Sequence, residues 1–446
     1  IPPPTMQSAA AKLARQQPLL LSHSSSLPFS RGLRLAAPLS QRRSISSASF
    51  SPSRQPVIVS AARTPIGSFG GSLSALKAPK LGSIAIMGAI EKAGIPPEYV
   101  QECIMGNVCG AGVGQAPARQ AAMGAGMAQS SIATTVNKVC ASGMKSVMLG
   151  GLSIMSGYRD VVVAGGMESM SNIPYYLPGA RTGYRLGNNT VVDGLINDGL
   201  WDIYNNQHMG NCGEACATKY GITREDQDNF AIASYERATS AWQAGLFDGE
   251  VSPVTIKGKR GKADSVVGVD EEFSGMNLDK LRTLRPAFAK EGTVTAANAS
   301  KLNDGASAMI MTSGKYAREN NLTPLFRVRG FGDAAKDPVE FTTAPSDAVP
   351  RALNHAGVSA KDVQFHEINE AFSVVGLVNA RLMDLDLATV NVHGGAVALG
   401  HPIGSSGSRI IGTLYGVLQA NDATIGCASI CNGGGGASAI VIERLN

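Results

Sequence analysis

Short apolar runs and longer amphipathic stretches alternate along the chain from residue 57 onward. Val57–Ser60 and Asp160–Gly166 have the β-branched character of strands, and the second is apolar enough to be buried. Leu81–Ala93 and Ser142–Ser156 predict helices, and the latter is apolar on nearly every side, as a buried helix is. Strands that alternate with helices in this way indicate an α/β fold with a central sheet.

Residues 171–285 interrupt that alternation. Loops rich in Asn, Gly, Asp and Lys surround one amphipathic helix there, Glu225–Ala244. This pattern predicts a loop domain inserted at about residues 171–285. Strand character resumes over Gly292–Thr312.

A short internal repeat supports two similar halves. Gly305–Met311 recurs as Gly436–Ile442, and each copy follows a turn that contains Gly and Asn. We therefore expect an N-terminal half over residues 57–316, which includes the loop domain, and a C-terminal half over residues 323–446.

A basic leader accounts for the positive charge of the chain. The protein has 446 residues and a formal charge of +5, but residues 1–56 contain seven basic residues, thirteen serines and no acidic residue. This composition is typical of a transit peptide, with a disordered basic tail as the alternative. We expect a mitochondrial transit peptide there and a location in the mitochondrial matrix. The remaining residues carry 32 basic and 34 acidic side chains, so the net charge gives no reason to expect a nucleic-acid partner.

Three further features of composition limit the function classes. No apolar stretch approaches the roughly 20 residues of a membrane span, so no membrane partner is expected. The seven cysteines are odd in number and follow no secretory signal, which predicts free thiols in a reducing compartment. The 52 glycines predict tight turns and close backbone approaches.

Cys140 stands between a predicted strand, Thr134–Asn137, and the predicted helix Ser142–Ser156. The N–H groups and the positive dipole end of a helix N-terminus lower the pKa of a thiol. The same N–H groups can receive an oxyanion. Cys140 is therefore a candidate nucleophile, and the alternative is a small buried side chain without chemistry.

His401 lies between Gly400 and Pro402, in a turn that opens a predicted helix over Ser408–Leu418. Such neighbours fix the backbone, and we expect the imidazole to point outward as a general base. The alternative is a histidine that only satisfies the backbone of a Gly-rich loop.

Cys431 begins a run of Asn432 and four glycines, at the end of a predicted strand that starts at Thr424. Consecutive glycines indicate that the backbone closely approaches a ligand or another strand. A phosphate-binding loop would need a following Lys-Ser/Thr and a helix start, and neither is present. Asn369 adds a polar group at another predicted strand-to-helix junction.

The remaining cysteines offer a rival metal site. Cys212 with Cys216, and Cys427 with Cys431, each have three residues between them. Structural zinc prefers tighter spacings in turns, so this reading is a remote alternative.

Five motifs together carry more information than any one of them. They are Cys-Ala-Ser-Gly-Met at Cys140, Gly-Gly-Met-Glu-Ser-Met at Gly165, Asn-Glu-Ala-Phe at Asn369, Gly-His-Pro-Ile-Gly at Gly400 and Cys-Asn-Gly-Gly-Gly-Gly at Cys431. In order and over residues 57–446 the chain resembles the thiolase family, and within it the acetoacetyl-CoA thiolase type. The resemblance implies two similar α/β halves in a five-layered αβαβα arrangement, an inserted loop domain and a homotetramer.

The resemblance also implies a role for each motif. Cys140 would be the nucleophile that takes the acetyl group, with His401 as its activating base. Cys431 would handle the α-proton of the second acetyl-CoA and protonate departing products. Asn369 would position a water that, with His401, stabilises the enolate oxyanion. The N–H groups of Cys140 and Gly433 would form a second oxyanion hole.

The implied reaction is the reversible Claisen condensation of two acetyl-CoA to acetoacetyl-CoA and CoA, without a prosthetic group. A degradative 3-ketoacyl-CoA thiolase is the nearest alternative; a 3-ketoacyl synthase fits less well because it requires no second Cys loop. A non-catalytic metal-binding or structural module is a remote one. Residues that match family positions for coenzyme A are His208, Met209, Tyr235, Lys280 and Ser300. Residues that match a potassium site in some members are Tyr235, Ala296, Ala297, Ala299 and Val397.

Overall fold

The computed structural model describes residues 52–258 and 261–446. The expected leader, residues 1–56, therefore lies almost wholly outside the described residues. Its last residues belong to the fold, however, because the first strand starts at Pro56 and Arg54 pairs with Asp160. The predicted start of the fold at residue 57 is corrected to this extent.

One large mixed sheet runs through the described chain. Its nine main strands are β1 (Pro56–Arg63), β3 (Glu102–Gly106), β4 (Ile132–Val136), β5 (Val161–Ser169), β12 (Asn303–Ser313), β13 (Phe326–Ala335), β14 (Phe365–Ile368), β15 (Ile425–Asn432) and β16 (Gly436–Arg444). The helices that cover it are α1 (Ala78–Ala93), α2 (Pro117–Gly124), α3 (Ser142–Met155), α8 (Pro345–Ala356), α9 (Ser373–Leu382) and α11 (Ser406–Ala420). The predicted helices and buried strands are confirmed to within a few residues at their ends.

The sheet divides into two halves that repeat one topology. The N-terminal strands lie in the order β1-β12-β5-β3-β4 and the C-terminal strands in the order β13-β16-β15-β14. In both, the first strand pairs antiparallel with the last, and β3 with β5, like β14 with β15, is parallel. The internal sequence repeat falls on β12 and β16, which occupy the same place in the two halves.

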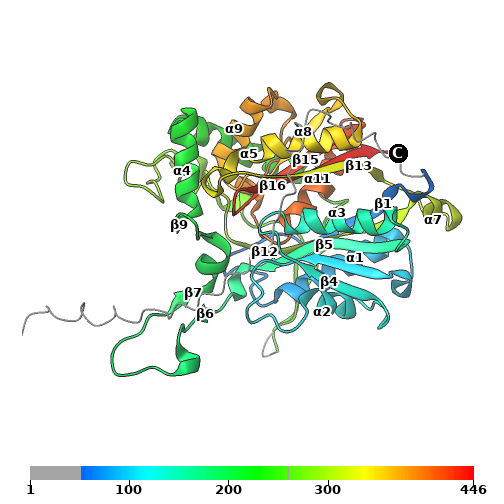
Figure 1. Ribbon diagram of the computed structural model, residues 1–446, viewed down its shortest axis with the longest axis horizontal. Coiled ribbons are helices and arrows are strands. Elements are labelled where there is room, and N and C mark those ends of the chain that lie inside the picture. The colour runs from blue at the N-terminus through cyan, green and yellow to red at the C-terminus, as the bar shows by residue number, and fades with distance from the viewer. Residues whose placement is uncertain (1–51, 259–260) are drawn as a thin grey trace, which may run out of the picture. The chain divides into compact units, whose positions relative to one another are not determined.

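The halves are joined at a narrow seam and by a shared layer of helices. β1 and β13 pair only through Val57 with Arg327 and Ile58 with Phe326. α3 packs on β3 and β5, α11 packs on β14 and β15, and the two helices contact each other. α1 and α2 cover the outer side of the N-terminal half and α8 covers that of the C-terminal half (Figure 1). Helices, sheet, helices, sheet and helices follow one another, so the expected five-layered α/β fold is confirmed.

The inserted region differs from its prediction in two respects. It contains the expected helix, α5 (Arg224–Gln243), but also α4 (Met209–Tyr220), which the hydrophobic pattern does not reveal. Strand character was expected from Gly292, yet β12 starts only at Asn303. The intervening backbone bonds to side chains instead: the Glu214 carboxylate accepts from the N–H groups of Thr293 and Val294.

The cysteines are free thiols, as the sequence predicts. All seven cysteines are buried and none forms a disulfide.

No helix in the part of the chain that the structure describes is both long enough and apolar enough to cross a membrane.

Candidate active site

Cys140 lies between β4 and α3, at the junction that the sequence predicts. The preceding residue, Val139, has a φ of 48°. A β-branched residue seldom adopts this left-handed conformation, so the turn that carries Cys140 is strained. The thiol is 4% exposed and lines a pocket.

The pKa of Cys140 differs in direction from the prediction. Burial raises it to about 12, although the N–H groups of Gly433 and of Cys140 itself act in the opposite direction. Burial disfavours the thiolate more than the nearby N–H groups favour it. The expected lowering by the helix N-terminus is therefore wrong for this resting state, and the thiol needs a base to lose its proton.

His401 provides such a base, in an orientation that corrects the sequence prediction. The imidazole does not point outward to solvent; it is 4% exposed and lines the same pocket as Cys140. Its Nδ1 lies 2.6 Å from the Ser406 hydroxyl, which donates to the carbonyl of Pro402 at 3.1 Å. Because the hydroxyl proton is used in that way, Nδ1–H donates to Ser406, and Nε2 keeps its lone pair.

Nε2 of His401 is buried and has no hydrogen-bond partner in the described residues. Burial, together with the charge of Arg409, lowers the pKa of His401 to about 3. The imidazole is thus neutral at rest and offers a free acceptor at Nε2. Because the same burial disfavours the imidazolium, a proton taken up there needs a negative charge beside it.

Close backbone packing fixes the loop that carries His401. A Cβ atom on Gly166 of β5 would lie 1.9 Å from the carbonyl oxygen of Gly404. Gly400 has a φ of 107°, and its neighbour's N–H donates to the Asn303 side chain at 2.8 Å. Glycine is required at both positions, one for space and one for conformation.

Cys431 lies at the end of β15, and Asn369 directly follows the neighbouring strand β14. The N–H of Asn369 donates to the Ser429 carbonyl at 2.9 Å, which keeps the two strand ends together. Burial raises the pKa of Cys431 well above its usual range, and the charge of Cys140 adds to that shift. Both polar atoms of the Asn369 amide are buried without a partner in the described residues.

Gly433 lies in the turn between β15 and β16. Its N–H is the first of the two that favour a Cys140 thiolate, which brings the Cys431 strand against the Cys140 turn. Gly434 and Gly435 form the turn itself, with φ angles of 81° and 86°. Gly433 and Cys431 thus lie near Cys140, and His401 shares its pocket. Asn369 joins this group through its backbone bond to β15.

A pocket of about 480 Å³ opens beside Cys140 and His401. Three of the residues expected to contact coenzyme A, His208, Met209 and Ser300, line it. The His208 ring stacks on Phe288 with the ring centroids 4.8 Å apart, and burial lowers the pKa of His208, so this wall is neutral. Such a mostly apolar slot suits the arm of a large thioester.

Two other residues of the coenzyme A prediction lie elsewhere. Lys280 is exposed on α6 (Leu278–Leu281) and is absent from the lining of the pocket. Tyr235 is 1% exposed in the interior of α5 and does not line the pocket. The structure therefore places neither residue against this pocket.

The expected potassium ligands gather only in part. Tyr235, Ala297 and Val397 share one buried apolar cluster. The Tyr235 hydroxyl and the Ala296 carbonyl, however, both accept a hydrogen bond from the Lys301 ammonium. An ammonium group already uses two of the five expected oxygen donors, so these residues do not fit a potassium ion as the sequence predicts.

The cysteine pairs of the rival metal reading lie on separate elements. Cys212 and Cys216 are on α4, whereas Cys427 packs among residues of α8 and β16. Within residues 52–258 and 261–446, no group of three or more His, Cys, Asp or Glu side chains is placed to hold a metal ion.

Sequence reasoning missed three residues of this site. Ser406 orients His401, and the small hydroxyl residues after Gly-His-Pro-Ile-Gly were the available signal. Phe288 covers His208 and Lys301 bonds to Tyr235, but both lie in segments without a periodic pattern.

Known proteins are similar to this chain over most of its length. The family model of the thiolase N-terminal domain matches residues 56–315, and that of the thiolase C-terminal domain matches residues 322–444. The chain is 55% identical to an acetyl-CoA acetyltransferase of Schizosaccharomyces pombe over 388 residues, which cover 87% of this chain and 98% of that protein.

Further relatives come from different compartments. Acetyl-CoA acetyltransferase B, mitochondrial, of Xenopus laevis is 55% identical over 390 residues, or 87% of this chain and 92% of that protein. A cytosolic acetyl-CoA acetyltransferase of Gibberella zeae is 54% identical over 388 residues, or 87% and 98%. The crystal structure of the Acat5 thiolase from Ascaris suum in complex with coenzyme A superposes with a TM-score of 0.83 at 44% identity, covering 88% of this chain and 100% of that chain. With both domain models matched and identities above half of the aligned positions, the chain belongs to the thiolase family.

Proposed function

We propose that the protein is an acyltransferase that condenses two acetyl-CoA to acetoacetyl-CoA and CoA, and catalyses the reverse thiolysis. The observation that carries this proposal is a buried thiol, Cys140, which shares one pocket with the unpartnered Nε2 of His401. A second thiol, Cys431, lies close enough to Cys140 for a charge on Cys140 to raise its pKa. Relatives named acetyl-CoA acetyltransferase are consistent with the same reaction.

The first half of the reaction is acetyl transfer to Cys140. His401 Nε2 takes the thiol proton as the sulfur attacks the thioester carbonyl. The N–H groups of Cys140 and Gly433 receive the oxyanion of the tetrahedral intermediate. Its collapse breaks the bond to the coenzyme A sulfur, which leaves with a proton from Cys431.

The second half joins the two acetyl units. The Cys431 thiolate removes an α-proton from a second acetyl-CoA, and the resulting enolate carbon attacks the acetylated Cys140. A water held by Asn369, together with His401, stabilises the enolate oxygen; the unpartnered amide of Asn369 has the donor for that water. The product leaves as its bond to the Cys140 sulfur breaks, and the protonated His401 returns its proton to that sulfur. Ping-pong kinetics follow from this sequence.

The coenzyme A arm of each substrate lies in the apolar pocket along His208, Met209 and Ser300. Tyr235 supports this wall from behind, and Lys280 reaches the phosphates from outside the pocket. The proposal includes no potassium ion as a ligand of Ala297, Ala299 or Val397, because the Lys301 ammonium already uses neighbouring oxygen donors.

The proposal extends to the whole chain. The leader that precedes the folded part directs the protein to the mitochondrial matrix. Residues 57–316, extended at their start to include β1 from Pro56, and residues 323–446 are its two halves, with a loop domain at about 171–285. The enzyme is a homotetramer. The leader composition and the mitochondrial relative from Xenopus laevis support the location.

Chain-length preference separates this function from that of a degradative 3-ketoacyl-CoA thiolase. Thiolysis of acetoacetyl-CoA should exceed thiolysis of a 12-carbon 3-ketoacyl-CoA by at least about 10-fold in kcat/KM, since apolar walls discriminate by about 10-fold or more per misfitting group. Steady-state assays on both substrates measure this ratio. A higher kcat/KM for the longer substrate would replace the proposal by the degradative alternative.

Replacement of Asn369 tests the enolate site separately. Asn369→Ala should lower kcat for condensation by about 10²-fold, as loss of one oxyanion donor does. The thermal unfolding midpoint should not fall, because the lost amide has no hydrogen bond to the described protein. Asn379, on α9, is a matched control: its buried amide donates to Thr342 and Val375, so Asn379→Ala should lower the midpoint instead. An Asn369→Ala enzyme with wild-type kcat would contradict the role.

A further inference from the structure

The Lys301 ammonium connects α5 to the wall of the pocket. Its Nζ donates to the Tyr235 hydroxyl at 3.1 Å and to the backbone carbonyl of Ala296. Tyr235 is fixed in the interior of α5, whereas Ala296 and Lys301 both line the pocket. One positive group thus binds oxygen atoms from two separate segments of the chain.

Lys301 keeps its charge at neutral pH although it is partly buried. Nζ also lies 5.9 Å from the centre of the Tyr235 ring, within cation–π distance. Burial lowers the pKa of Lys301 to about 8, while the Glu272 carboxylate acts in the opposite direction. The side chain is therefore mostly an ammonium at neutral pH. Its hydrogen bonds to neutral oxygens are charge-assisted and thus stronger than those of an uncharged donor.

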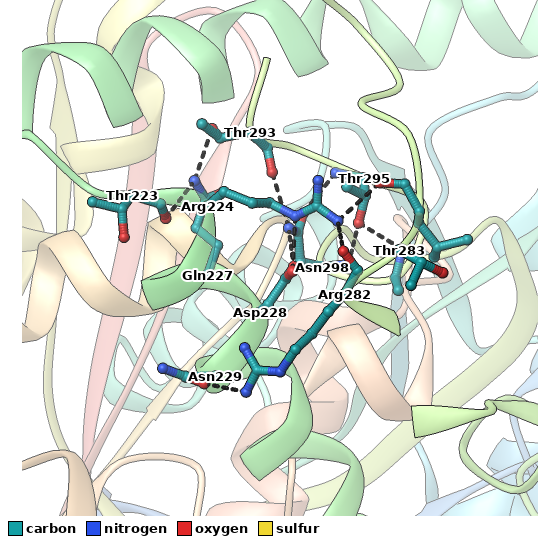
Figure 2. A network of polar contacts seen from close by, with 12 residues as sticks. Thr223, Arg224, Gln227, Asp228, Asn229, Arg282, Thr283, Thr293, Thr295 and Asn298 are labelled. Carbon is teal, nitrogen blue, oxygen red and sulfur yellow. Dashed lines mark hydrogen bonds and ion pairs between the residues drawn. The ribbon is translucent and has the colours of Figure 1, made fainter. Parts of the chain in front are cut away.

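The same pocket wall is tied to α5 at a second point. Asn298 donates to Asp228 of α5 at 2.9 Å, and its side-chain oxygen accepts from the N–H of Thr295 at 2.7 Å. Figure 2 shows this network, in which Arg224 also pairs with Asp228. This network holds Thr295, and Lys301 holds the carbonyl of the adjacent Ala296.

We propose that Lys301 is a built-in monovalent cation that holds the Thr295–Ser300 wall of the pocket against α5, so that substrate binding needs no added potassium. A primary ammonium and a potassium ion carry the same charge and bind the same carbonyl and hydroxyl oxygens. A free cation would have to share those oxygens with the ammonium at contact distance, where like charges repel. This inference rests on the proposed function only for its substrate readout.

The wild-type enzyme gives the first test, because it needs no variant to fold. KM for acetoacetyl-CoA and the thermal unfolding midpoint are measured in potassium, sodium and choline chloride at equal ionic strength. We expect both quantities to be the same in the three salts within experimental error. A KM that potassium alone lowers several-fold, or a midpoint that potassium alone raises, would overturn the proposal.

Removal of the ammonium gives the second test. Lys301→Ala should raise KM about 10-fold in choline chloride, and potassium should restore most of the loss and raise the unfolding midpoint. Lys315→Ala, which removes an exposed lysine on α7 (Gly314–Glu319), should behave as the wild type does in every salt. Wild-type KM for Lys301→Ala in choline, or a raised KM that potassium does not restore, would contradict the cation role.

The two readouts separate this proposal from the proposed function. If neither the wild type nor any variant catalyses thiolysis in any of the salts, the proposed function fails. The unfolding midpoints of the wild type and of Lys301→Ala in the three salts still show whether the ammonium takes the place of a potassium ion. Lys301→Met serves in place of Lys301→Ala if the smaller side chain prevents folding, because it keeps the apolar stem.

Discussion

Cys140→Ala should lower the rates of condensation and thiolysis by about 10⁴-fold or more, because it removes the sulfur that forms the covalent intermediate. The Cys140 thiol shares its pocket with His401, and the Gly433 N–H lies close enough to favour its thiolate. Initial rates of acetoacetyl-CoA thiolysis, with the free CoA concentration varied, measure the loss.

A buried thiol elsewhere provides the control for this result. Cys103 is fully buried in β3, does not line the pocket and has its sulfur near the Ala118 carbonyl. Cys103→Ala removes the same atom from the core and should keep activity within about 2-fold. Activity of Cys140→Ala within 10-fold of the wild type would contradict covalent catalysis at this position.

Cys431→Ala should lower condensation by about 10²–10⁴-fold, the usual contribution of a general acid–base group. The acetyl group should still appear on Cys140, since that sulfur and the His401 imidazole remain. Exchange of the α-protons of acetyl-CoA with deuterated water should be lost in parallel with condensation. Mass spectrometry of the protein and NMR of the substrate measure the two effects.

Cys427, on the same strand, is the matched control for Cys431. It is fully buried, and its sulfur packs toward α8 rather than toward the pocket. Cys427→Ala should retain both exchange and condensation within a few-fold. If Cys431→Ala retained wild-type exchange, another base would have to carry the α-proton step.

The hydrophobic pattern predicts most of the fold but not its local exceptions. β1, α1, α3, β5 and α11 follow from periodicity, because each buries a continuous apolar face. α4 was missed because His208 caps it in place of the usual Ser, Thr, Asp or Asn. The segment at Gly292 looks like a strand, but the carboxylate of Glu214 satisfies backbone groups that a neighbouring strand would otherwise pair.

The chemistry of the site is less accessible from the sequence than its residue types. Cys140 and His401 lie at the junctions that the motifs predict. The predicted direction of the Cys140 pKa shift and the predicted orientation of His401 were wrong, however. Both errors have one cause: burial depends on the packing of the two halves, which no local pattern records. The contact between Lys301 and Tyr235 joins residues that are 66 positions apart, so it too depends on the folded chain.

Capture of the acetyl-enzyme tests the central claim most directly. The wild-type protein is mixed with radiolabelled acetyl-CoA in the absence of free CoA, quenched in acid and digested, and the labelled peptide is sequenced. The account predicts about one acetyl group per chain, attached to Cys140 and removed when CoA is added. Label on any other residue, or none on Cys140 in an enzyme that is active, would contradict it.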